Sequence, residues 1–144
     1  MNNEDLSLKL FVVLTRALSS IRKRAEEDIK ELGLNPTEFA VLEFIYSKGE
    51  QSIQKIGQKV LIASSSITYV VDKLEKKQLI KRKPCPTDRR ITFVALTDEG
   101  QAIMDELFPQ HKESLTKIFE GLDREEKQVM IEQLKKLGYH AEKK

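Results

Sequence analysis

Two short strand-like segments lie close together in the second half of the chain, separated by a turn rich in proline and charge. They span residues 79–83 and 91–96, and the turn begins at Pro84. Short segments on either side of a turn are typical of a β-hairpin. The residues just upstream, 64–74, have helical periodicity with short polar side chains at their start. The sequence therefore predicts a helix followed directly by a hairpin.

Positive charge is concentrated on this helix and hairpin. The whole chain has a formal charge of only +2, but residues 51–96 contain ten basic and three acidic side chains, a net charge of +7. Arginines at the tip of a hairpin have the shape and charge needed to reach a DNA minor groove. A solvated lysine-rich helix face is the alternative, but the coincidence of charge, helix and hairpin favours a surface that binds a polyanion.

Three motifs follow one another across the hairpin. Asp88-Arg89-Arg90 precedes Val94-Ala95-Leu96-Thr97, and Gly100 follows. This order resembles the Asp-x-Arg and Val-x-Leu-Thr-x-x-Gly signature of the MarR family of bacterial transcription regulators. The similarity reaches upstream to Asn35-Pro36-Thr37-Glu38-Phe39, and so covers roughly residues 34–100 with specific motifs. It implies a mainly α fold with a small β-wing, in which N- and C-terminal dimerisation helices flank a winged helix-turn-helix.

Helical spacing and capping residues agree with this organisation. A first helix is expected over about 5–32, and caps at Asn35, Ser52, Thr97 and Asp123 predict the starts of later helices. We expect a single domain over residues 1–144. Its dimerisation helices would lie in 1–34 and 98–144, and its DNA-binding lobe in 35–97.

Two residues depart from an ideal pattern. Pro109 lies inside the predicted fifth helix, which it should kink or break. Gln78 stands where the family often has glycine, and a left-handed conformation there would cost roughly 1 kcal/mol, which leaves open a turn that is built differently.

The terminal helices carry more apolar residues than one small core needs. We expect them to form a homodimer interface, as the resemblance also implies. The alternative is that they cover the core of a compact monomer. The residues concerned are Leu6, Leu8, Phe11, Phe108, Leu115, Ile118, Phe119 and Leu122.

A symmetric dimer would place two recognition helices in successive major grooves of a palindromic operator in double-stranded DNA. The serines and Thr68 can bond phosphates or base edges, and Tyr69 and Lys73 can reach phosphates. By resemblance, Arg90 enters the minor groove and Asp88 holds it. The alternative roles are helix capping for the serines and an exposed turn pair for Asp88 and Arg90. The candidate DNA-binding residues are Gln54, Lys55, Ser64, Ser65, Ser66, Thr68, Tyr69, Lys73, Asp88, Arg89 and Arg90.

The resemblance also implies a small aromatic or phenolic effector near the junction of the dimerisation helices and the lobe. Phe11, Thr15, Phe44 and Tyr46 are candidates for its surroundings. The segment 34–90 resembles the quinone- and hydroquinone-responsive branch of the family.

Cys85 is the single cysteine and the candidate redox residue. Its neighbours Lys81, Arg82 and Lys83 would favour the thiolate. Hydroperoxide sensors of the family carry their cysteine near the start of the first helix, and residues 8–17 contain none. Sensing of electrophiles by Cys85 is therefore a hypothesis, beside the alternative of an inert wing residue.

Other function classes have little support in the sequence. The two histidines lack partners at metal-binding spacing, and we find neither a nucleophile elbow nor a phosphate-binding glycine loop. The start Met1–Asp5 is acidic and no apolar run is long enough to span a bilayer, so we expect a cytoplasmic protein without a membrane partner. We expect no enzyme, cofactor or metal. The predicted function is a sequence-specific DNA-binding transcription regulator, acting as a repressor, and the alternatives are an architectural DNA binder and a protein-interaction module.

Overall fold

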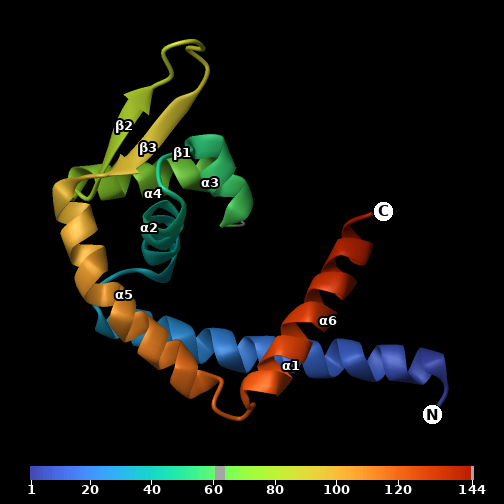
Figure 1. The fold of residues 1–144 in the computed structure, drawn as a ribbon. Helices are drawn as coiled ribbons and strands as arrows, with labels where there is room; N and C mark the ends of the chain where they lie inside the picture. The colour runs from blue at the N-terminus through green and yellow to red at the C-terminus, as the bar shows by residue number, and fades with distance from the viewer. Residues whose placement is uncertain (61–63, 144) are drawn as a thin grey trace.

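The computed structural model describes residues 1–60 and 64–143, and the side chains of Ser64 and Ser65 lie outside that description, as does the predicted turn 61–63. The described residues form six helices and one small antiparallel sheet (Figure 1), which confirms the predicted fold class. The elements are α1 (Asn3–Glu31), α2 (Pro36–Lys48), β1 (Gln51–Ser52), α3 (Ile53–Lys59), α4 (Ser64–Lys76), β2 (Ile80–Pro84), β3 (Thr92–Leu96), α5 (Asp98–Ile118) and α6 (Arg124–Glu142).

The predicted hairpin is β2 and β3, each within one residue of its expected bounds. The two strands pair antiparallel, with Arg82 opposite Val94 and Pro84 opposite Thr92. A third strand, β1, adds to the other side of β3 and gives the order β1-β3-β2. β1 has only two residues, which is too short for a period-2 pattern, and the sequence did not predict it.

The four predicted helix caps are present. Asn35 accepts hydrogen bonds from the backbone N–H groups of Thr37 and Glu38, and Ser52 accepts one from Lys55 at 3.1 Å. Asp123 forms a reciprocal capping box at the start of α6. These side chains satisfy backbone donors that a helix start leaves free, which is why the local sequence sets these boundaries.

The fourth cap, Thr97, also joins the wing to α5. Its hydroxyl donates to the Gln78 carbonyl at 2.6 Å and accepts from the Gly100 N–H at 3.0 Å. A Cβ atom at Gly100 would lie 2.1 Å from the Leu79 carbonyl oxygen, so only glycine fits there. The Leu-Thr-x-x-Gly motif thus holds the start of α5 against the turn between α4 and β2. In that turn Gln78 has a φ of 64°, the left-handed conformation in which glycine is favoured.

The core lies between α2, α3, α4 and the sheet, and the ends of two long helices complete it. Ile29 of α1 and Met104 of α5 are buried against the lobe, so the core extends beyond residues 35–97. The buried apolar residues of the lobe are Phe39, Val41, Leu42, Ile45, Ile56, Ile67, Val70, Val71, Leu74, Leu79, Ile80 and Val94.

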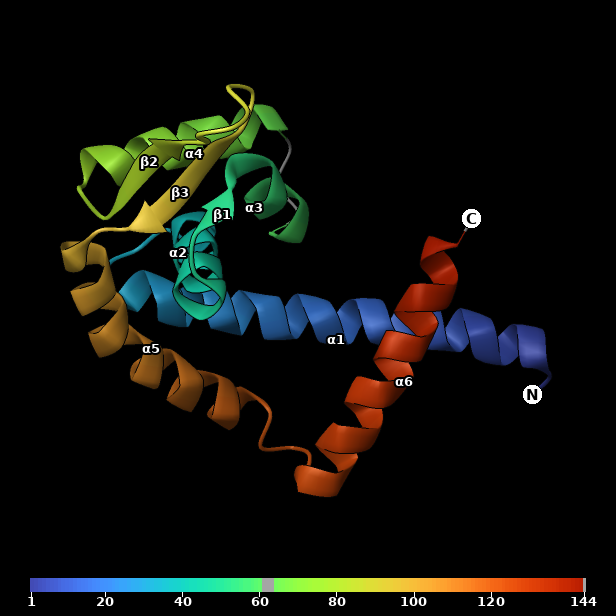
Figure 2. The same ribbon diagram turned by 45° about the horizontal axis from the view of Figure 1, so that its top comes forward.

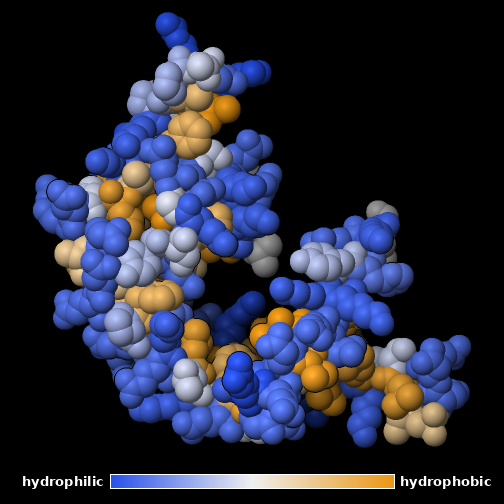
Figure 3. Space-filling model, in the orientation of Figure 1, coloured by the Kyte–Doolittle hydropathy of each residue, from blue (hydrophilic) through white to orange (hydrophobic). Residues whose placement is uncertain are grey.

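The terminal helices form an arm away from this lobe (Figure 2). α5 continues through Pro109 to Ile118, so the proline does not end the helix, and the helix is curved along its length (Figure 1). Hydrophobic side chains lie on the surface of the arm formed by α1 and α6 (Figure 3). Within the described residues, no helix is both long and apolar enough to cross a membrane.

Candidate nucleic-acid interface

α4 has one buried and one polar face, as the sequence predicted. Ile67 and Leu74 are buried, whereas Ser66, Thr68 and Tyr69 are exposed on the other side. The Lys73 ammonium lies 5.6 Å from the centre of the Tyr69 ring, a cation–π contact that orders both side chains. The face therefore offers hydroxyls and a positive charge at its surface. Ser64 and Ser65 begin the same helix, but their side chains lie outside the described residues.

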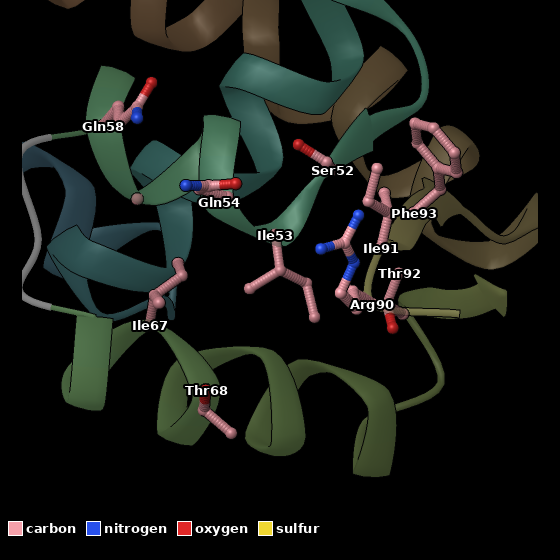
Figure 4. Close-up of a pocket in the computed structure, with 11 residues that line it drawn as sticks. Ser52, Ile53, Gln54, Gln58, Ile67, Thr68, Arg90, Ile91, Thr92 and Phe93 are labelled. Carbon is pink, nitrogen blue, oxygen red and sulfur yellow. The ribbon is translucent and has the colours of Figure 1, made fainter. Parts of the chain in front are cut away.

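An open groove of about 710 Å³ connects α4 to α3 and the wing (Figure 4). Gln54 from α3, Thr68 from α4 and Arg90 from the wing all line it. The structure therefore brings predicted residues from three separate segments onto one surface. Lys55 is also exposed on α3, beside Gln54.

The wing turn holds Arg90 in a fixed position. The turn is closed by backbone hydrogen bonds from Cys85 to Ile91 and from Ile91 to Asp88. The Asp88 carboxylate accepts hydrogen bonds from the Arg90 backbone N–H at 2.9 Å and from its guanidinium at 3.1 and 3.0 Å. These bonds, those from the guanidinium above all, hold the pKa of Asp88 below its ordinary value. The Arg90 side chain is nonetheless 89% exposed, so it is oriented yet free to contact a ligand.

Arg89 is exposed at the same turn.

Arg82 belongs to the basic run at residues 81–83, but its positive charge is directed at acidic residues of the protein itself. Its guanidinium donates to both Asp72 and Glu75 of α4. Lys83, next to it, lies 3.2 Å from Glu50. The sequence showed only the positive charges of this run. No local signal indicated their partners, because those partners lie seven residues or more away.

Cys85 is half-buried at the start of the wing turn. Its sulfur lies 3.4 Å from the Thr87 hydroxyl, and hydrogen bonding by Thr87 lowers the pKa of the thiol. Hydrogen bonding by Thr87, rather than the basic run at residues 81–83, is thus the main cause of the lowered pKa.

The residues considered for an effector site occupy two different environments. Phe44 and Tyr46 pack against the core on α2, whereas Phe11 and Thr15 are exposed on α1. Tyr46 donates to Asp105 of α5 at 2.7 Å, a hydrogen bond that raises the pKa of its phenol. In this single chain the four side chains therefore do not form one enclosed site.

Comparisons with known proteins agree with this architecture. The MarR family model matches residues 34–92. The HTH-type transcriptional regulator MhqR of Bacillus subtilis (strain 168) is 50% identical over 137 residues, covering 95% of this chain and 94% of the relative. Sco3205, a MarR-family regulator of Streptomyces coelicolor solved in complex with DNA, superposes with a TM-score of 0.84 at 19% identity and covers 98% of this chain and 93% of its own. NadR, solved with 4-hydroxyphenylacetate, superposes with a TM-score of 0.75 at 22% identity, covering 88% and 89%. This chain belongs to the MarR family of winged-helix transcription regulators.

Proposed function

We propose that this protein is a repressor that binds a palindromic operator as a homodimer and that a small aromatic or electrophilic effector releases it. α4 would enter the major groove with Ser66 and Thr68 at base edges or phosphates, and Tyr69 and Lys73 would contact phosphates. Ser64 and Ser65 are proposed for the start of the same helix. Gln54 and Lys55 on α3 would contact the DNA backbone.

The wing would contact the adjacent minor groove through Arg90, with Arg89 as a second contact. A narrow minor groove attracts arginine through its negative potential. The observation that carries the proposal is the position of Arg90, which Asp88 orients on the groove that Gln54 and Thr68 also line. Three elements thus offer DNA-binding side chains to one surface.

Dimerisation would use those apolar side chains of α1 and α6 that the single chain leaves exposed. In a symmetric dimer the two α4 helices would lie about 34–36 Å apart, one turn of B-DNA. Because the two subunits are related by two-fold symmetry, the two half-sites at that spacing would form a palindromic operator.

An effector would act by favouring a dimer with a different spacing of its two α4 helices. NadR binds a phenolic acid, which supports an aromatic ligand for a protein of this fold. The lowered pKa of Cys85 supports a second route, in which an electrophile reacts with its thiolate. Replacement of Cys85 by serine should then abolish release by a quinone while release by a non-reactive phenol persists.

Titration of labelled DNA tests the DNA-binding part of the proposal. The duplex would come from immediately upstream of the protein's own gene, and a shuffled duplex would be compared at two salt concentrations. We expect tight, palindrome-dependent binding that weakens steeply with salt. Equal binding to both duplexes would indicate an architectural DNA binder instead, and binding to neither would favour a protein-interaction module.

An arginine variant tests the assigned residues. We expect Arg90→Ala to weaken operator binding by roughly tenfold to a hundredfold. Arg24→Ala, an exposed arginine on α1 outside the groove, is the matched control and should leave binding within about twofold.

A further inference from the structure

All three acidic residues of the positive segment 51–96 are bound by arginines. Arg90 binds Asp88, and Arg82 of β2 binds both Asp72 and Glu75. Asp72 and Glu75 are three residues apart, so they lie on one side of α4, the side that faces β2. One guanidinium thereby occupies two carboxylates of the recognition helix.

These two carboxylates lie on the helix that is proposed to enter DNA. Their side chains are 52% and 42% exposed, and Asp72 directly precedes Lys73. Carboxylates that lack a partner at this position would repel the phosphates that Lys73 is proposed to bind. Arg82 is only 27% exposed, and it is therefore turned toward α4 rather than outward.

Arg82 also fixes the wing relative to α4. A planar guanidinium that bridges two carboxylates restricts both distance and direction, as a lysine would not. Successive residues of a strand point to opposite faces, and Lys83 accordingly contacts Glu50 on the other side of β2. The strand that leads to the wing tip is held on both faces.

We propose that Arg82 is a positioning residue for DNA binding, which acts through Asp72 and Glu75 and does not touch DNA itself. It neutralises the carboxylates of α4 and holds the wing, and hence Arg90, at a set distance from that helix. This inference rests on the proposed DNA-binding function.

A double-mutant cycle tests it. Operator affinity is measured for the wild type, Arg82→Gln, the pair Asp72→Asn with Glu75→Gln, and the triple variant. We expect Arg82→Gln to weaken binding about tenfold in the native background and by less than about twofold when both carboxylates are already neutral. Lys81→Gln removes the same charge from the neighbouring strand position, where no ion pair occurs among the described residues. It should have the same small effect in both backgrounds.

Two results would overturn the inference. An equal loss in both backgrounds would mean that Arg82 contacts DNA directly, and native affinity for Arg82→Gln would mean that the bridge has no role in binding. Helical content and melting temperature are measured for each variant, and Arg82→Lys replaces Arg82→Gln in both backgrounds if the glutamine variant does not fold. Failure of the wild type to bind the operator would instead refute the proposed function, and Arg90→Ala serves as the positive control for lost binding.

Discussion

The DNA-binding lobe and the last helix differ in the burial of their apolar side chains. In the lobe, large side chains such as Phe39, Leu42 and Leu74 are fully buried. α6 has 19 residues and buries none of them. Its large apolar side chains are all exposed, namely Val129, Met130, Ile131, Leu134, Leu137 and Tyr139.

This difference shows where each region obtains its stability. Burying one leucine or phenylalanine stabilises a fold by about 1.5–3 kcal/mol. The lobe gains this stabilisation because its apolar side chains are buried against one another within a single chain. Met130, Leu134 and Leu137 follow helical spacing and form one stripe along α6. A stripe of this kind in water gives α6 little stability, so we expect it to be buried against a second copy of the chain.

The largest expected effect comes from charging this stripe. Leu134→Asp combined with Leu137→Asp should convert the protein into a monomer, as light scattering would measure. Operator affinity should fall by about a hundredfold or more because one chain reaches only one half-site. The lobe should keep its cooperative melting.

Gln128→Asp, which adds a charge at an exposed polar position on the opposite side of the same helix, is the control and should remain dimeric. A dimeric double variant would show that α6 does not form the interface, and the contrast between lobe and terminal helix would need another explanation.

A second prediction compares glycines in the two regions. Gly100→Ala forces a Cβ atom against the Leu79 carbonyl and should destabilise the protein by about 3 kcal/mol or more. Gly138 of α6 has nothing within 4 Å of an added Cβ, and Gly138→Ala should stabilise the helix by up to about 1 kcal/mol. Denaturant unfolding measures both. A strongly destabilising Gly138→Ala would indicate instead that a partner chain packs closely on that residue.

The third prediction concerns the left-handed turn of the lobe. Gln78→Gly should raise stability by about 1 kcal/mol, because glycine adopts a φ of 64° without steric cost. Lys76→Gly, two residues earlier in α4, is the opposite control and should lower stability by about 1 kcal/mol. Thermal melting distinguishes the two signs, and equal destabilisation would mean that the Gln78 side chain makes a contact that outweighs the strain.

The helix caps illustrate what the sequence could predict. The helix starts at Asn35, Ser52, Thr97 and Asp123 are set by side chains within three residues of the backbone groups they bind, so a local pattern is sufficient. The left-handed turn at Gln78 was not predicted, because the glycine that would indicate it is absent.

Features that join distant segments could not be predicted in this way. His111 of α5 is buried and packs on the Phe39 ring at 4.7 Å, with Glu43 3.5 Å from its imidazole. Arg82 bridges two acidic residues of another element. Neither contact could be predicted, because the sequence gives a residue's type but not what the fold brings beside it.

The smallest expected effect lies at the exposed wing, where hydrogen bonds between neighbouring residues hold the side chains and little apolar surface is buried. Asp88→Asn keeps an oxygen for the Arg90 backbone N–H but loses the charge that orients its guanidinium. Operator affinity should fall by roughly twofold to fivefold. Because Arg90 lowers the pKa of Asp88, the stabilising effect of the carboxylate is present above the ordinary aspartate pKa and is lost only as the pH falls through the lowered value. The ratio of the two affinities should therefore be the same at pH 7 and pH 5. A ratio that approaches one by pH 5 would mean that Asp88 is already protonated there, and that Arg90 does not hold it as the wing geometry requires.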